Sequence, residues 1–482
     1  MSFSSKAKIN YTFRICVSIF LVAELLSWLS FNFTTLNIII LPAIAALVIL
    51  LVIRDPIYAL YLPAAELFWG SLGHSFYYDF WSIRLVIFVA VIFAFFLGNL
   101  FNIKKLAIKR DVKVLLIWLV LLLLIILSGA SAYFANRDTA KIFFDGNAYF
   151  YLLYLPIWYQ VYQTRHLRNI IDMLQAAALV IAVKTLVVFN LFSQGYQILD
   201  LDFIYKWIRD TRTGEITPFS NNFTRVFMQS QIYLLAAWFF AFIRQLKEYK
   251  SWSNFIYLGV LAAALLVSLS RSFWLGGVLG FIFLLVNIII YQRRNLSGLI
   301  YLTILGVVAV GFLTVQIFFN LPKWNSFNIV EQRTVDTTEA AANSRMNLLP
   351  VMWQAVQEKP IMGHGLAKEL SYRSSDPRIK NEENPDGWHT TYAFEWGWLD
   401  QWLKMGIFFI AVLMAWVLLI YARSYRLLIQ DPVLGLGVLA IMTSLGIVHI
   451  FSPYLNHPLG LGLLMLMTVI ISKNERQSFS YR

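Results

Sequence analysis

Long apolar runs, separated by short polar turns, occupy most of the chain. A helix needs roughly 20 predominantly apolar residues to cross the hydrocarbon core of a bilayer, which is about 30 Å thick. Such runs predict an all-α fold, a polytopic transmembrane helical bundle. They lie at residues 15–31, 36–53, 84–101, 113–130, 168–192, 226–243, 254–270, 273–291, 298–319, 400–421, 433–450 and 457–472.

Two further segments are less apolar. Residues 57–70 contain Pro63 and Glu66, and residues 142–160 contain Asp145 and several tyrosines. If both segments cross the membrane, the bundle has about fourteen helices. If either is re-entrant or interfacial, the topology downstream of it changes.

Two polar segments, 193–225 and 320–399, are longer than most helix connections. We expect membrane helices with the first long loop over residues 1–319, a large extracytoplasmic loop over 320–399, and the last membrane helices with a cytoplasmic tail over 400–482. Within the large loop, apolar residues recur at helical spacing from Asn343 to Lys359 and predict an amphipathic helix that ends at Pro360.

The composition agrees with membrane embedding, because 59% of the residues are hydrophobic and only 13% are charged. The net charge of +13 does not indicate nucleic-acid binding, since the basic residues gather in short loops on one side of the predicted membrane. This bias predicts cytoplasmic termini and places both long loops outside. The single cysteine, Cys16, excludes an intrachain disulfide and a cysteine metal cluster.

Charged residues within the predicted spans include Glu24, Glu66, Asp145 and Lys184. A charge in the membrane is costly and needs a partner. These residues either pair with one another and with arginines, or form an ion path. The second alternative would make the chain a solute or ion transporter.

Basic residues also occur in the outer segments, where the charge bias does not favour them. Arg271, in Ser270-Arg271-Ser272, lies at a turn with little polar sequence around it. It is either an interfacial arginine that extends to water or part of an anion site, since a guanidinium binds phosphate with two parallel hydrogen bonds. The other outer basic residues are Lys206, Arg209, Arg212, Arg225, Arg333, Arg345, Arg373 and Arg378.

Two histidines are candidates for chemistry. His389 precedes a predicted helix, at the membrane edge of the large loop, where a base would meet a lipid-borne substrate. His364 lies between Gly363 and Gly365, which would let backbone N–H groups approach an anion or simply end a helix. The acidic residues of the loop lack the spacing of a metal site, so we expect neither a metal nor a cofactor. Those residues are Asp376, Glu382, Glu383 and Asp386.

Several short motifs follow one another over residues 255–425, and their order and spacing resemble the O-antigen ligase family. This family includes surface-polysaccharide polymerases. Thr390 follows the histidine where many members carry Asn, so this motif does not assign a subgroup. The motifs are Ser270-Arg271-Ser272, Arg345 before Trp353, Pro360 to Gly365, His389 to Tyr392, Glu395-Trp396-Gly397 and Met405-Gly406-Ile407.

The resemblance implies a C-type glycosyltransferase of the bacterial inner membrane with an extracytoplasmic active site. Its donor would be a polyprenyl-diphosphate-linked oligosaccharide, and its acceptor a hydroxyl of a glycan or of a lipid core. His389 would match the general base, and Arg271, Arg345 and Arg225 would match the arginines that hold the diphosphate. The family chemistry is inverting and metal-independent. Whether the chain acts as a ligase or as a polymerase stays open.

Overall fold

The computed structural model describes residues 11–99, 107–194, 200–220, 223–247, 252–291, 340–376 and 379–479, together with Gly298 and Gly306. The predicted span at 298–319 lies outside the described residues apart from these two glycines. Arg333 and Arg378 also lie outside them.

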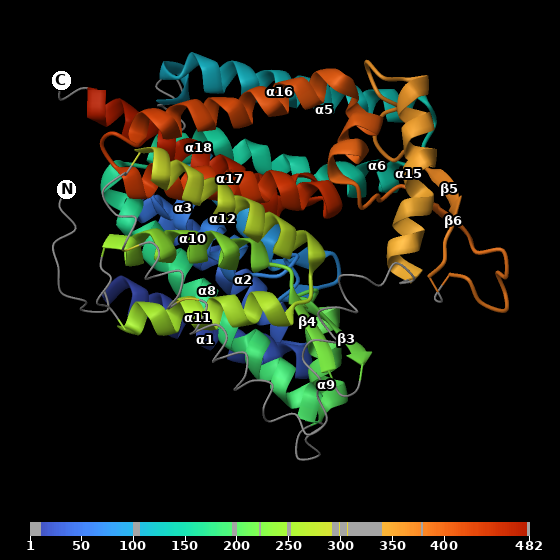
Figure 1. Ribbon diagram of the computed structural model, residues 1–482, viewed down its shortest axis with the longest axis horizontal. Helices are drawn as coiled ribbons and strands as arrows, with labels where there is room; N and C mark the ends of the chain where they lie inside the picture. The colour runs from blue at the N-terminus through green and yellow to red at the C-terminus, as the bar shows by residue number, and fades with distance from the viewer. Residues whose placement is uncertain are drawn as a thin grey trace.

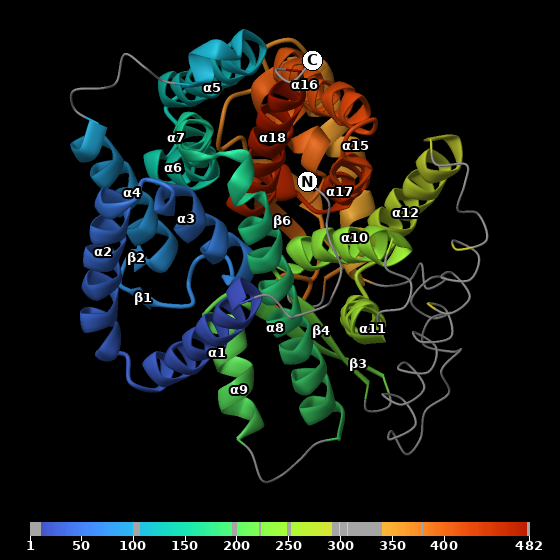
Figure 2. The ribbon, with the colours of Figure 1, turned by 90° about the vertical axis from the view of Figure 1, so that its left-hand side faces the viewer.

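Most helices run side by side along the long axis of the molecule (Figure 1). Viewed along that axis, α8 passes through the middle of the bundle against α1, α10 and α11 (Figure 2). The helices are α1 (Tyr11–Asn32), α2 (Leu36–Arg54), α3 (Tyr58–Trp69), α4 (Ile83–Asn99), α5 (Val112–Phe134), α6 (Thr139–Gly146), α7 (Tyr154–Val161), α8 (Leu167–Gln194), α9 (Leu201–Asp210), α10 (Gln231–Lys247), α11 (Trp252–Val267), α12 (Arg271–Tyr291), α15 (Ala340–Glu358), α16 (Gly397–Leu427), α17 (Pro432–Phe451) and α18 (Pro458–Phe479).

Three two-stranded antiparallel hairpins complete the described structure: β1 (Tyr77–Tyr78) with β2 (Trp81–Ser82), β3 (Gly214–Ser220) with β4 (Phe223–Met228), and β5 (Leu370–Arg373) with β6 (Trp388–Thr391). The last two hairpins, α9 and α15 lie at one end of the bundle, and the C-terminal end of α18 lies at the other (Figure 1).

Within the described residues, seven helices are long and apolar enough to cross a membrane: α1, α2, α5, α8, α12, α16 and α17. Shorter apolar helices lie at Ile83–Gly98, Gln231–Leu246 and Trp252–Val267. These helices coincide with apolar runs of the sequence. The chain is therefore a polytopic helical membrane protein, and the total of about fourteen spans stays a prediction.

The less apolar segment at 57–70 forms α3, a helix of 12 residues that covers only about 18 Å. The chain continues beyond it without helical structure and reaches the turn after α9, where the Ser71 hydroxyl donates to Thr211 O (2.8 Å). Gly70, Ser71 and Ser75 are buried. Irregular backbone at membrane depth is tolerated where it is covered by protein.

The other less apolar segment also follows a broken path between the two ends of the bundle. It consists of α6, a 3-10 stretch at Asn147–Leu153 and α7. Lys141 pairs with Glu369 of the large loop at one end (2.5 Å). At the other end, Gln160 accepts from the Ala107 N–H (2.7 Å).

The charges at Glu24, Glu66, Asp145 and Lys184 all have partners. Lys184 pairs with Glu24 (2.7 Å), which also accepts from Trp69 Nε1 (2.9 Å). Glu66 pairs with Arg84 (2.9 Å), and Asp145 pairs with Lys404 (2.6 Å). The expectation that these charges need partners is confirmed.

Two glycines set the packing of α12 on α17. A Cβ at Gly276 would lie 2.6 Å from Val448 Cγ2, and one at Gly280 would collide with the Ser444 side chain. The Ser444 hydroxyl donates to Gly276 O (2.8 Å). Small residues at this spacing let two membrane helices approach closely, and here they bring the start of α12 beside the end of α17.

Candidate functional site

Arg271 is the first residue of α12. This helix begins at the end of the bundle that carries the β3–β4 hairpin, the β5–β6 hairpin and α15 (Figure 1). Hydroxyl groups surround this helix start: Ser270 Oγ lies 3.2 Å from Ser272 Oγ, which lies 3.0 Å from Ser452 Oγ at the end of α17. The start of a helix carries partial positive charge on its unpaired N–H groups. Arg271 adds a full charge at the same place, which favours an anion.

Arg225 reaches the same turn from β4. Its Nε donates to Ser268 O (2.9 Å), and Nη1 lies 3.9 Å from Glu215 Oε2 on the paired strand β3. The turn that accepts this hydrogen bond includes Leu269, whose φ of 44° is left-handed. The structure therefore brings Arg225 to the turn that leads into Arg271.

Arg345 lies in α15, and its guanidinium forms an ion pair with Glu395. The Arg345 carbonyl accepts from Trp396 Nε1 (3.0 Å). The ring of Trp396 in turn packs against Phe451 of α17 (5.5 Å between centroids). Since Ser452 follows Phe451 and bonds Ser272, a short series of contacts links Arg345 to the start of α12.

His389 lies in β6, directly opposite Tyr372 of β5. The two rings meet edge to face, with centroids 5.8 Å apart. The pKa of the Tyr372 phenol is raised, chiefly by burial; a hydrogen bond to Ser374 and the charge of Arg345 lower it, and Asp376 raises it.

The predicted site residues fall into two groups. Arg225 and Arg271 share the turn before α12, whereas Arg345 and His389 belong to α15 and the β5–β6 hairpin that packs on it. The contacts of Trp396 and Ser452 join the two groups.

The segment Gly363 to Gly365 is docked tightly into the protein. The N–H groups of Gly363, His364 and Gly365 donate to carbonyl oxygens of Lys359, Leu403 and Lys404 at 3.1, 2.7 and 2.8 Å. His364 Nε2 lies 2.7 Å from Ala355 O. Because these N–H groups already have protein acceptors, the segment serves as the turn that ends a helix, and we do not include it in the anion site.

Both glycines of this turn have positive φ, 69° at Gly363 and 91° at Gly365. A Cβ at Gly365 would lie 2.9 Å from Ser128 O, and one at Gly363 would lie 2.6 Å from Lys404 O. Glycine is therefore required at both positions for two reasons: the backbone has positive φ, and α5 and α16 approach too closely for a Cβ.

Sequence reasoning did not single out Arg137 and Lys404, which hold this turn in place. Arg137 donates to the carbonyl oxygens of His364, Gly365 and Leu366. Lys404 is buried between Asp145 (2.6 Å) and Asp400 (2.7 Å). A lysine inside the apolar run at 400–421 was the available signal, since it needs acidic partners.

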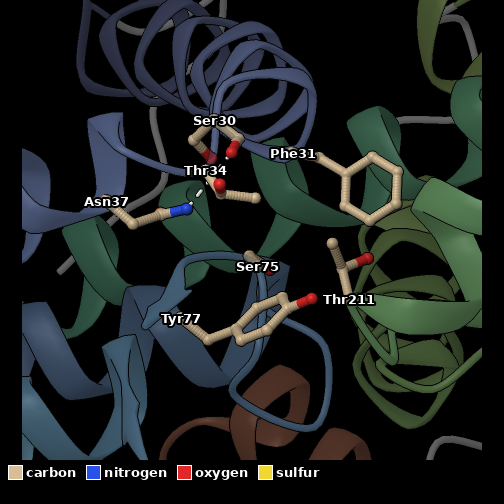
Figure 3. A pocket seen from close by; sticks show the side chains of 7 residues that line it. All are labelled: Ser30, Phe31, Thr34, Asn37, Ser75, Tyr77 and Thr211. Carbon is tan, nitrogen blue, oxygen red and sulfur yellow. Dashed lines mark hydrogen bonds between the residues drawn. The ribbon is translucent and has the colours of Figure 1, made fainter. Parts of the chain in front are cut away.

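A small polar pocket lies elsewhere, between the ends of α1 and α2 and the turn after α9 (Figure 3). Its volume of about 10 Å³ has room for no more than about one water molecule. It contains none of the predicted site residues. The described residues also include no group of three or more His, Cys, Asp or Glu side chains that could hold a metal ion. The pocket is lined by Ser30, Phe31, Thr34, Asn37, Ser75, Tyr77 and Thr211.

The part of the chain that carries these residues matches a known family. Residues 256–408 match the family model described as O-Antigen ligase. Searches of curated proteins and of solved structures return no match. The matched range begins in α11, ends in α16 and includes Arg271, Arg345 and His389. Residues 256–408 of this polytopic membrane protein are therefore similar to the O-antigen ligase family.

Proposed function

We propose that the chain is an inverting glycosyltransferase of surface-polysaccharide assembly in a bacterial inner membrane. It moves an oligosaccharide from a polyprenyl diphosphate to an acceptor hydroxyl of a glycan or of a lipid core, on the outer face of the membrane. The observation that carries this proposal is the family domain, whose range includes Arg271, Arg345 and His389. The start of α12, α15 and the β5–β6 hairpin carry these residues and lie at one end of the helical bundle (Figure 1), which supports the proposal.

The reaction breaks the bond between the anomeric carbon and the diphosphate oxygen, and forms a bond to the acceptor oxygen. His389 accepts the acceptor's proton, and the diphosphate leaves on its lipid. The acceptor hydroxyl is a poor nucleophile, and a positioned base contributes about 10²–10⁴-fold to the rate.

The arginines act on the leaving group. Negative charge accumulates on the diphosphate as the glycosidic bond breaks, and fixed cations stabilise it best where water is partly excluded. Arg271 and Arg225 contribute from the start of α12, and Arg345 from α15. Arg345 already holds Glu395, so the diphosphate competes with that carboxylate for the guanidinium.

The decisive experiment uses purified protein and a lipid-linked oligosaccharide. His389→Ala is expected to abolish transfer while the protein still inserts and purifies normally. His166→Ala is a matched control, because this histidine lies at a 3-10 turn before α8, and it should transfer normally. Near-normal transfer by His389→Ala would remove the base assignment.

Transfer is also expected to continue when a metal chelator is present. Loss of transfer in the chelator would overturn metal independence.

Ligase and polymerase activity are distinguished in cells that lack the gene. Accumulation of single lipid-linked repeats indicates a polymerase, and accumulation of long lipid-linked chains indicates a ligase. An unchanged glycan profile favours the transporter alternative, which depended on the intramembrane charges. Each of those charges has an opposite charge as its partner.

A further inference from the structure

The level of the membrane along the bundle can be estimated from a charged cluster at the end opposite α15. Asp111, at the start of α5, pairs with Arg423 of α16 (2.6 Å) and with Arg476 of α18 (3.1 Å). Glu475 completes the cluster by pairing with Arg423 (3.3 Å). Such a concentration of charge is tolerated at the edge of the hydrocarbon core rather than at its centre.

Two helices lead from this cluster toward α15. A stretch of roughly 20 helical residues covers the hydrocarbon thickness, and from Asp111 along α5 it ends near Ser131. From Arg423 back along α16 the helix is continuous as far as Ile407, a rise of about 24 Å, because Gly406 (φ 80°) interrupts it. Both positions meet the same turn: the Ile407 N–H donates to Pro360 O (3.0 Å), and a Cβ at Gly365 would lie 3.3 Å from Ser131 Oγ. The turn after α15 therefore lies at the second edge of the hydrocarbon core.

Large apolar side chains at this level are exposed. Ile361 and Met362 in the turn are 55% and 57% exposed, and Trp353 of α15 is 46% exposed. Trp353 packs against Trp402 of α16 (5.8 Å between centroids), whose Nε1 donates to Pro360 O (2.9 Å). We call Trp353, Ile361, Met362 and Trp402 the anchor surface.

The anchor surface adjoins a lipid-facing surface. Pro360 O accepts from the Ile407 N–H (3.0 Å), so the turn lies against α16 just before Phe408. Phe408 and Leu418 are exposed apolar residues of this membrane helix, at 54% and 62%. The exposed apolar band of α16 therefore continues onto the turn after α15.

We propose that the anchor surface inserts into the interfacial layer of the bilayer, among lipid headgroups and the first carbons of the acyl chains. Trp is enriched at this layer because its ring is apolar and its N–H is polar. A helix can lie in the plane of the interface with its apolar side chains buried there, and α15 runs across the direction of the bundle (Figure 1). This contact holds Arg345 and the β5–β6 hairpin at the membrane surface, and does not depend on glycosyl transfer.

The single native cysteine makes a depth measurement practical. In a Cys16→Ser background, Met362→Cys carries a spin label in vesicles of phosphatidylethanolamine and phosphatidylglycerol, and collision rates with oxygen and with a water-soluble nickel chelate are measured. Two matched positions calibrate the scale. Glu382→Cys labels the exposed segment between β5 and β6, and Leu418→Cys labels the membrane-facing side of α16.

The oxygen-to-nickel ratio at Met362→Cys is expected to be several-fold above that at Glu382→Cys and below that at Leu418→Cys. A ratio equal to that at Glu382→Cys would mean that the surface faces water and would overturn the proposal. Protection from both reagents, with dipolar coupling between labels, would mean that a second copy covers the surface and would also overturn it. Ile361→Cys gives a second reading at the adjacent position, so the conclusion does not depend on one variant.

Discussion

Whether a predicted arginine can bind an anion depends on which of its N–H groups already donate to acceptors within the protein. Arg345 is paired with Glu395, a residue that stood in the sequence only as part of a motif. Arg225 uses its Nε to hold the turn before α12. Sequence position can nominate an arginine for an anion site, but only the fold decides which of its N–H groups already have acceptors.

Arg271 tests the anion site at the residue scale. Arg271→Ala is expected to reduce transfer by about 10²–10³-fold, equivalent to about 2.7–4 kcal/mol of barrier, by analogy with loss of an oxyanion-hole donor. Arg271→Lys should recover only part of this, because an ammonium lacks the planar fork that binds two phosphate oxygens. Initial rates at varied donor concentration make the comparison. Equal rates for the lysine variant and the native chain would rule out two-point binding.

At the scale of elements, the turn from Gly363 to Leu366 is what attaches the large loop to the membrane helices. Arg137 of the α5–α6 connection holds three of its carbonyl groups, and Asp145 of α6 accepts from the Ala367 N–H (2.7 Å). The amphipathic helix predicted at Asn343–Lys359 is confirmed by α15, Ala340–Glu358. The side chains that hold the turn after it were not predictable, because Arg137 lies more than 200 positions away in the chain.

Lys404→Met tests this attachment. It leaves Asp145 and Asp400 buried without a cation, and breaking a buried ion pair on one side costs about 3–5 kcal/mol. We expect a clear loss of thermal stability in detergent and faster proteolysis of the large loop. Lys141→Met is the control, because the Lys141–Glu369 pair is exposed, and it should change little. Equal stability of the two variants would contradict a stabilising role for the buried triad.

The same turn is expected to loosen in acid. Burial lowers the pKa of His364 below its ordinary value of 6.5, with Lys368 and Lys359 acting in the same direction. The Ala355 carbonyl and Glu358 act against them. The unfolded turn therefore binds a proton more readily than the folded one, so stability is full above pH 6.5 and falls as the pH drops toward the folded pKa.

Hydrogen exchange of the turn between pH 7.5 and 5 measures this effect. Protection should decrease with acidification in the native chain and change less in His364→Gln. Identical pH profiles for both proteins would exclude titration of His364 as the cause.

At the scale of the whole molecule, sidedness is the main expectation still to be measured. The charged cluster of Asp111, Arg423, Glu475 and Arg476 lies at the end of the bundle opposite the β5–β6 hairpin. The charge bias of the loops predicts that this end is cytoplasmic.

Cysteine labelling of intact cells tests the sidedness. In the Cys16→Ser background, Glu382→Cys should react with an impermeant maleimide in intact cells lacking an outer-membrane barrier. Gln430→Cys, in the exposed turn between α16 and α17, should react only after the inner membrane is opened. The reverse pattern would invert the topology and place His389 in the cytoplasm.

The sequence by itself determined the membrane class, the positions of most apolar helices and the similarity of residues 256–408 to the O-antigen ligase family. The first two depend on local composition, since each apolar run must satisfy its backbone hydrogen bonds as a helix in lipid. The need for partners at Glu24, Glu66, Asp145 and Lys184 was also readable, because an unpaired charge in the membrane is costly.

Only the tertiary structure decided which partners those charges have and how the turn after α15 is held. It also decided that the helix at 57–70 ends after 12 residues and that a 3-10 stretch separates α6 from α7. Each of these depends on contacts between stretches that are distant along the chain, such as Lys404 with Asp145. Apolar periodicity carries no information about such pairings, because any helix of the bundle offers a similar surface to its neighbours.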